Sequence, residues 1–244
     1  MTAIQIMGLM KKFREKTAVD ALSLSIEQGE IFALLGVNGA GKTTTIKMLT
    51  CLSKPTNGDA VLLGDSVVSN AYAVKEKIGV SPQETAIARN LSVKENLAFI
   101  AKIYEFNKKA VDKKVEEMLT AFSLMEVSND KAKTLSGGMQ RRLSIAMALI
   151  SNPQILFLDE PTLGLDVIAR RELWKIVEKL KGKITIILTT HYMEEAEALS
   201  DRIGIMVKGK LKAVGTAEEL RAKMNAKSLE DAFISIVAQE EAAS

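Results

Sequence analysis

The most informative segment of the chain is Ile31-Phe32-Ala33-Leu34-Leu35-Gly36-Val37-Asn38-Gly39-Ala40-Gly41-Lys42-Thr43-Thr44-Thr45-Ile46-Lys47-Met48-Leu49. Its apolar start predicts a buried strand, its centre a glycine-rich loop, and its end a helix from Thr43 to about Leu52. The loop has the pattern G-x-x-x-x-G-K-S/T, which binds the phosphates of a nucleoside triphosphate when a strand precedes it and a helix follows. The sequence therefore predicts a triphosphate-binding loop.

We expect each position of this loop to contribute to triphosphate binding. Gly36 and Gly41 allow backbone angles that a side chain would forbid, so that successive amides can turn toward the phosphates. The start of the following helix offers free N–H groups and a partial positive charge. Lys42 would reach the terminal phosphates, and the Thr43 hydroxyl would bind Mg²⁺. The other loop residues that we expect to bind the nucleotide are Val37, Asn38, Gly39, Ala40 and Thr44.

The composition is typical of a globular protein with a mixed charged surface. Of the 244 residues, 47% are hydrophobic and 26% are charged, and the net charge is +3. No block of lysine and arginine is dense enough to suggest a nucleic-acid partner. Cys51 is the only cysteine, which excludes an internal disulfide and favours a reducing compartment. Because there is neither a signal-peptide pattern nor a run of roughly 18 apolar residues, we expect no leader and no membrane span.

Strand-like and helical segments alternate along the chain. Up to residue 83, strands are expected at 4–7, 22–26, 31–35, 60–63 and 78–80. From Glu84 to Ile150 the pattern is helical, with helices expected at 96–106, 108–122 and 143–150, the first opened by a capping box at Ser92 and Glu95. After Pro153, strands are expected at 155–158, 184–188, 203–207 and 211–214, and helices at 167–180, 193–199 and 229–238. A second capping box begins at Thr216.

This order predicts an α/β fold. Apolar strands that alternate with helices form a mostly parallel sheet flanked by helices on both faces, here with an N-terminal antiparallel β part and an inserted α-helical subdomain. We expect residues 1–83 and 153–215 to form the core, 84–152 the helical subdomain, and 216–244 a C-terminal helical extension.

Two acids follow an apolar strand in Ile155-Leu156-Phe157-Leu158-Asp159-Glu160. In folds with a phosphate loop, a carboxylate at the end of such a strand binds Mg²⁺, a role that we assign to Asp159. Glu160 is suited to polarise a water molecule for attack on the γ-phosphate, so we expect it to be catalytic. Two solvated acids at a strand end are the alternative, which the four preceding apolar residues and the phosphate loop disfavour.

A second anion site is expected at Leu135-Ser136-Gly137-Gly138-Met139-Gln140, where a buried helix begins. The two glycines and the serine hydroxyl form another helix start with free amides. The sequence thus predicts two phosphate-binding helix ends, with Leu135, Ser136, Gly137 and Gly138 at the second.

Five motifs follow one another along the chain: the phosphate loop, the Ser136 motif, Asp159-Glu160, Gly164-Leu165-Asp166, and His191. This order resembles that of the ATP-binding subunits of ABC transporters, over essentially the whole chain. The resemblance implies a P-loop NTPase fold of the RecA-like type, ATP and Mg²⁺ as cofactors, and ATP hydrolysis coupled to transport.

The resemblance also implies roles for four further residues. Gln83 would touch Mg²⁺ and sense a membrane partner, and His191 would contact the γ-phosphate as a second catalytic residue. Asp166 would cross a dimer interface, although it could equally cap a helix. Phe13 stands where the family usually stacks a tyrosine on the adenine, and a phenylalanine keeps the aromatic face for stacking. The alternatives are a surface amide for Gln83, a structural histidine for His191 and a core side chain for Phe13.

In this family each nucleotide lies between the phosphate loop of one subunit and the serine-glycine-glycine motif of another. The resemblance therefore implies a second ATP-binding subunit, giving an ATP-bound homodimer, and a separate transmembrane permease that holds the pair at the cytoplasmic face of the membrane. The segment 189–197 and the ending 228–233 resemble those of drug, sodium, lipid or polysaccharide exporters. We expect residues 84–106 to contact the permease.

Three other classes of protein are alternatives. One is a soluble ATPase of the same family acting on ribosomes or DNA, and another is a regulatory subunit that binds ATP without hydrolysing it. Intact Glu160 and His191 count against the latter. The third is a GTPase, which is poorly supported because Asn107-Lys108-Lys109-Ala110 lacks the aspartate that would read guanine.

Overall fold

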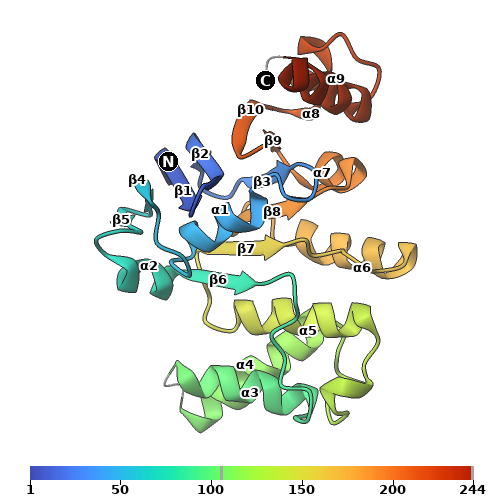
Figure 1. Ribbon diagram of the computed structural model, residues 1–244. Helices are drawn as coiled ribbons and strands as arrows, with labels where there is room; N and C mark the ends of the chain where they lie inside the picture. The colour runs from blue at the N-terminus through green and yellow to red at the C-terminus, as the bar shows by residue number, and fades with distance from the viewer. Residues whose placement is uncertain (105–106, 243–244) are drawn as a thin grey trace.

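The computed structural model describes residues 1–104 and 107–242. Its N-terminal part is a four-stranded antiparallel sheet in the order β2-β1-β4-β5 (Figure 1). The strands are β1 (Thr2–Phe13), β2 (Lys16–Glu27), β4 (Asn57–Leu62) and β5 (Asp65–Ser66). β1 and β2 extend well beyond the expected 4–7 and 22–26, because their pairing continues through register shifts that interrupt the alternation of apolar residues. The antiparallel part is confirmed.

The second sheet has the order β10-β9-β3-β8-β7-β6, and within it only β10 pairs antiparallel. Its strands are β3 (Ile31–Leu35), β6 (Ile78–Ser81), β7 (Ile155–Asp159), β8 (Thr185–Thr190), β9 (Arg202–Val207) and β10 (Lys210–Gly215). The expected mostly parallel sheet is confirmed. Because neighbouring parallel strands end at the same edge, the ends of β3, β6, β7 and β8 lie together there, beside the phosphate loop.

Six helices surround these sheets in the described part of the chain: α1 (Lys42–Leu49), α2 (Ala71–Lys77), α6 (Val167–Glu178), α7 (Met193–Leu199), α8 (Ala217–Lys223) and α9 (Leu229–Ala242). α7 has the expected bounds. α1 ends at Leu49 rather than Leu52, since Cys51 adopts a left-handed φ of 56°. α2 was not expected, because Val74 is its one buried residue and a helix without an apolar stripe leaves no periodic signal.

A helical block lies beyond β6, at the bottom of Figure 1. It contains α3 (Val93–Ile103), α4 (Lys108–Ala121), a short 3-10 helix (Ala132–Thr134) and α5 (Gly137–Leu149). The capping box at Ser92 and Glu95 is confirmed, and α3 begins directly after Ser92, at Val93 rather than at the expected residue 96, because Glu95 belongs to its first turn. The helix ends at Ile103 with Tyr104 as its C-cap, earlier than the expected end at residue 106, which itself lies outside the described residues. Asn107, which the GTPase alternative invoked, caps α4 by accepting a hydrogen bond from Ala110 N.

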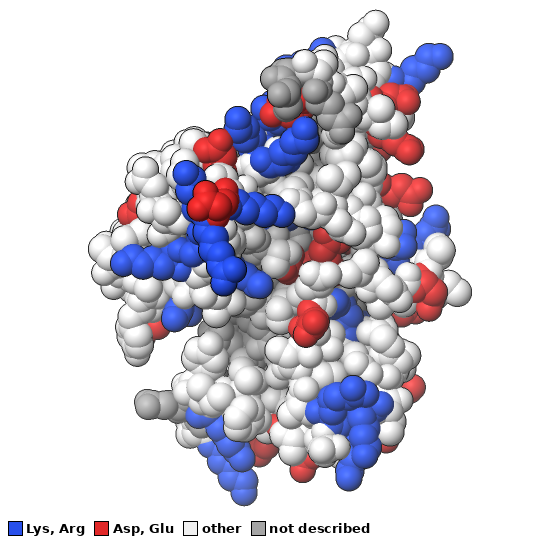
Figure 2. Space-filling model, viewed as in Figure 1, with Lys and Arg blue, Asp and Glu red and all other residues white. Residues whose placement is uncertain are grey.

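Two apolar clusters hold the molecule together. One lies between the antiparallel sheet and the parallel sheet and includes Ile4, Ile46 and Phe157. The other is continuous from the helical block across the parallel sheet to α9, and includes Leu97 and Phe233. Basic and acidic side chains are interspersed over the face seen in Figure 2. None of the helices within the described ranges combines the length and apolarity needed to cross a bilayer.

Candidate functional site

The phosphate loop lies between β3 and α1, and two of its glycines have no room for a side chain. Gly41 precedes α1 with a φ of 104°, and a Cβ there would lie 2.5 Å from Ala18 O. A Cβ on Gly36 would lie 2.5 Å from Met206 O. Gly36 does not have a positive φ, so the expectation that it supplies a special backbone angle is wrong: it is needed for space. No side chain caps α1, which leaves its first N–H groups available to an anion.

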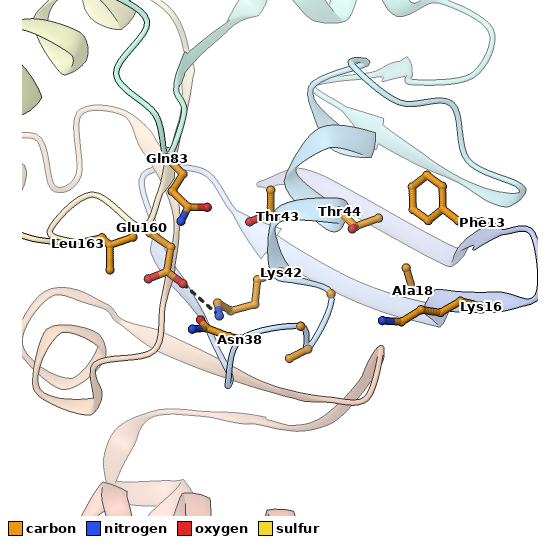
Figure 3. A pocket seen from close by; sticks show the side chains of 13 residues that line it. Phe13, Lys16, Ala18, Asn38, Lys42, Thr43, Thr44, Gln83, Glu160 and Leu163 are labelled. Carbon is orange, nitrogen blue, oxygen red and sulfur yellow. Dashed lines mark ion pairs between the residues drawn. The ribbon is translucent and has the colours of Figure 1, made fainter.

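Lys42 is held at the bottom of the loop. Its side chain is buried, and Nζ donates to Gly36 O at 2.7 Å and to Val37 O at 3.3 Å. Nζ also forms an ion pair with Glu160 Oε1 at 3.1 Å, the dashed line in Figure 3. Both side chains of this pair are about 5% exposed, so water screens their attraction little. The buried carboxylate of Glu160 is therefore held next to Lys42 at the bottom of the phosphate loop.

Asp159 and Thr43 are brought together from different elements. Thr43 Oγ1 at the start of α1 donates to Asp159 Oδ1 at the end of β7 over 3.1 Å. Thr189 Oγ1 on the adjacent β8 donates to the same oxygen at 2.6 Å. In the part of the chain that the structure describes, no group of three or more His, Cys, Asp or Glu is placed to hold a metal. One carboxylate and a hydroxyl nevertheless fit Mg²⁺, which takes few protein ligands and completes its shell with phosphates and water.

Glu160 turns back over the phosphate loop because its backbone is left-handed, with a φ of 49°. Its backbone N–H donates to Thr189 O at 3.2 Å and to Thr189 Oγ1 at 3.0 Å, which holds this unusual conformation. His191, just beyond β8, places Nδ1 2.6 Å from Glu160 Oε2. The structure thus brings the two expected catalytic residues into direct contact, with Lys42 on the other carboxylate oxygen.

A cavity of about 470 Å³ opens above these groups. Figure 3 shows Gln83 and Glu160 on one side of it, Lys42 and Thr43 on another, and Phe13 at its far end. Phe13 is 52% exposed, so the alternative of a core side chain is wrong. Lys11 Nζ lies 5.1 Å from the centroid of its ring. The complete lining is Phe13, Lys16, Ala18, Asn38, Gly39, Ala40, Gly41, Lys42, Thr43, Thr44, Gln83, Glu160 and Leu163.

The serine-glycine-glycine motif forms a different surface. Ser136 caps α5 by accepting a hydrogen bond from Met139 N at 3.3 Å. Asp166 caps α6 by accepting hydrogen bonds from Ile168 N and Ala169 N, each at 2.9 Å, which confirms the helix-cap alternative for this residue. Both line a cavity of about 390 Å³ that shares no lining residue with the cavity of about 470 Å³ described above, here called the Lys42 cavity. A single chain therefore does not bring Ser136, Gly138 or Asp166 to the phosphate loop, and Leu135 is buried beneath the motif.

Three residues near the site were not anticipated from the sequence. Thr189 bridges Asp159 and Glu160, and its position at the end of a strand neighbouring β7 was the available signal. Arg141 is buried in α5 and donates to the backbone before and at Gln83. Glu195 on α7 is fully buried, accepts a hydrogen bond from Trp174 Nε1 at 3.2 Å, and has its pKa raised by burial. Nothing local in the sequence marks the last two as buried.

The chain is similar to known proteins in sequence and in structure. The family model described as ABC transporter matches residues 19–163. The daunorubicin resistance ATP-binding protein DrrA3 of Streptomyces coeruleorubidus is 40% identical over 223 residues, which cover 91% of this chain and 71% of that protein. The phospholipid-transporting ATPase ABCA3 of Homo sapiens is 41% identical over 227 residues, but the chain spans only 13% of its length.

A solved structure is also similar. It is a dimeric ATP-binding cassette in a post-hydrolysis state, bound to ADP and Pi. The two chains superpose with a TM-score of 0.79 at 26% sequence identity, covering 87% of this chain and 98% of the other.

Proposed function

Because this chain belongs to the ABC transporter family of ATP-binding subunits, we propose that it hydrolyses ATP to drive export through a separate transmembrane permease. The observation that carries this proposal is the continuous set of contacts from Lys42 through Glu160 to His191, beside the contact of Thr43 with Asp159, on one cavity. These are the groups that bind a triphosphate, orient water and hold Mg²⁺ in phosphoryl transfer. Export is proposed because relatives are named for drug resistance and phospholipid transport.

In the proposed reaction the phosphates displace Glu160 from Lys42. Lys42 and the amides of the loop then bind the terminal phosphates. Thr43, Asp159 and Gln83 would hold Mg²⁺, which neutralises charge on the phosphates when bound. Glu160 accepts a proton from a water molecule while the oxygen of that water attacks the γ-phosphorus. The bond between the γ-phosphorus and the oxygen that bridges it to the β-phosphorus breaks, which gives ADP and phosphate. His191 holds the Glu160 carboxylate through Oε2 and would contact the γ-phosphate.

We propose that two copies complete each other's sites. Ser136 and Asp166 form a polar surface apart from the Lys42 cavity, so within one chain the second anion site has no nucleotide to bind. A dimer with two-fold symmetry would place the Ser136 motif of one subunit over the phosphate loop of the other. The dimeric form of the similar solved cassette supports this arrangement. Closure on ATP and opening after hydrolysis would then move the permease, at the cytoplasmic face of the membrane.

The permease would bind a mainly apolar groove between the core and the helical block, which we propose to be a subdomain comprising residues 84–152. The groove has a volume of about 430 Å³ and includes Leu52 and Tyr104, 67% and 45% exposed. Ala86 and Ile100 also line it, which agrees with the expectation that residues 84–106 contact the partner. Residues 216–244 would remain a C-terminal extension of the 1–83 and 153–215 core.

The decisive experiment substitutes Glu160→Gln. This variant should bind Mg·ATP, release no phosphate, and form a dimer whose mass is measured by light scattering. Lys42→Ala is the contrasting variant, which should lose ATP binding and remain a single subunit. Near-normal phosphate release by Glu160→Gln, or single subunits at saturating Mg·ATP, would contradict the proposal.

A further inference from the structure

Arg141 is a buried cation that the proposed mechanism does not use. It lies in α5 with 5% of its surface exposed. Nη1 donates to Pro82 O at 2.7 Å, and Nη2 donates to Gln83 O at 2.6 Å. Burial lowers the pKa of the guanidinium, and the charges of Asp159 and Glu195 oppose that shift. A desolvated cation whose two bonds go to adjacent backbone carbonyls indicates a specific structural task.

The position of Arg141 continues a regular contact between α5 and β6. A Cβ on Gly79 would lie 2.2 Å from Ala148 O, so strand and helix touch closely there. Further along, Ser81 Oγ and Ser144 Oγ share a hydrogen bond of 2.9 Å. Residues 148, 144 and 141 follow one another at helical spacing on a single face of α5. Arg141 therefore extends the α5–β6 contact past the end of the strand, onto the backbone that carries Gln83.

The backbone at Gln83 needs such support. β6 ends at Ser81, so sheet pairing no longer holds the chain at Gln83. The Gln83 side chain is exposed and lines the phosphate cavity, where its direction depends on this backbone (Figure 3). A planar guanidinium can donate to two acceptors at fixed separation, whereas a lysine ammonium donates from a single point.

We propose that Arg141 is a positioning residue that holds the backbone of Gln83, so that its amide faces the phosphate cavity. The effect on catalysis rests on the proposed function, because it requires Gln83 to act on Mg·ATP. Since α5 begins at the Ser136 motif, a displacement of this helix moves Arg141 and Gln83 together. The arrangement thereby connects the surface that would meet a partner's nucleotide to a side chain in the chain's own nucleotide cavity.

The first test needs no nucleotide. A nitroxide spin label at position 84 (Glu84→Cys in a Cys51→Ser background) reports the mobility of the backbone beside Gln83. Arg141→Lys should shorten the rotational correlation time of the label severalfold. Ser144→Ala, which removes the neighbouring α5–β6 hydrogen bond, should leave it unchanged. Equal mobility in wild type and Arg141→Lys would overturn the proposal, as would an equal increase in both variants.

The second test is a double-mutant cycle in the full-length protein. Arg141→Lys should raise the Mg²⁺ concentration for half-maximal ATP hydrolysis by about 10-fold or more, as loss of an outer-shell partner typically does. In a Gln83→Ala background the same substitution should have no further effect. An equal factor in both backgrounds would show a general structural effect and refute the positioning role. If Arg141→Lys does not fold, Arg141→Gln replaces it in both tests.

The two tests separate the inference from the proposed function. If the wild-type chain hydrolyses no ATP even with its membrane partner, the proposed function fails, while the spin-label comparison still decides whether Arg141 holds the backbone at Gln83. If the wild type hydrolyses ATP and the label does not respond, only the inference fails.

Discussion

The ion pair between Lys42 and Glu160 predicts that Glu160→Gln destabilises the nucleotide-free protein. The two atoms are 3.1 Å apart and both side chains are about 5% exposed. Removing one partner of a buried pair typically costs 3–5 kcal/mol, because the other charge stays buried without compensation. Here Lys42 keeps its bonds to Gly36 O at 2.7 Å and Val37 O at 3.3 Å, and the new amide still offers an acceptor.

We therefore expect a loss of about 2 kcal/mol, below the usual range for a broken buried pair. In a chain of this size that corresponds to a fall in Tm of about 4–8 °C. Bound ATP removes the cost, since its phosphates become the partners of Lys42 in both proteins. The variant should accordingly bind ATP about 30-fold more tightly than wild type, since each 1.4 kcal/mol is tenfold in affinity.

The assay is thermal unfolding over a range of ATP concentrations in the presence of EDTA, together with equilibrium binding of ATP to dilute protein. Chelation of metal prevents hydrolysis, so both measurements report binding alone. Glu178→Gln removes a charge from an exposed position on α6 and is the matched control, with no expected change in Tm. If nucleotide-free Glu160→Gln melted at or above the wild-type temperature and bound ATP no more tightly, the reasoning from the buried ion pair would be refuted.

Two further predictions concern the residues that the sequence did not reveal. Thr189→Val removes the hydroxyl that donates to Asp159 and accepts from Glu160 N, so it should lower the free energy of unfolding by about 2 kcal/mol and slow phosphate release. Thr189→Ser keeps the hydroxyl and should retain the stability and the activity of the wild type. A stable, fully active Thr189→Val would contradict the bridging role. Burial raises the pKa of Glu195 above its ordinary value of 4.5, so the folded protein retains a proton that the unfolded chain has lost. The contribution of Glu195 to stability therefore falls as pH rises from about 4.5 toward the folded-state pKa. In urea unfolding, the free energy of unfolding of Glu195→Gln should rise steadily relative to that of the wild type over this pH interval. A difference that does not change with pH would refute the raised pKa of Glu195.

Some features of the site were predictable because their causes are local. The spacing of glycines, lysine and threonine after an apolar strand is enough to identify a phosphate loop, since all of these residues lie within one short segment of the chain. The capping box at Ser92 and the bounds of α7 were likewise confirmed, because caps and helical periodicity act within a few residues. The parallel sheet followed from the alternation of apolar strands with helices.

Other features depended on residues that are distant in the sequence. The left-handed backbone of Glu160 is held by Thr189, and its side chain is placed between Lys42 and His191 by the order β3-β8-β7. Gly36 illustrates the same limit, because the carbonyl that leaves no room for a Cβ belongs to Met206 on β9. Register shifts in β1 and β2 also concealed the length of those strands.

The fold class, the phosphate loop and the identities of the acids and the histidine could be predicted from the amino-acid sequence, because they follow from local spacing and apolar periodicity. The three-dimensional structure was needed to show which of these groups touch one another, that Ser136 lies on a separate surface, and that Arg141 donates a hydrogen bond to the backbone of Gln83. Burial and pairing of charges are set by which strands and helices become neighbours, and this depends on the packing of the entire core.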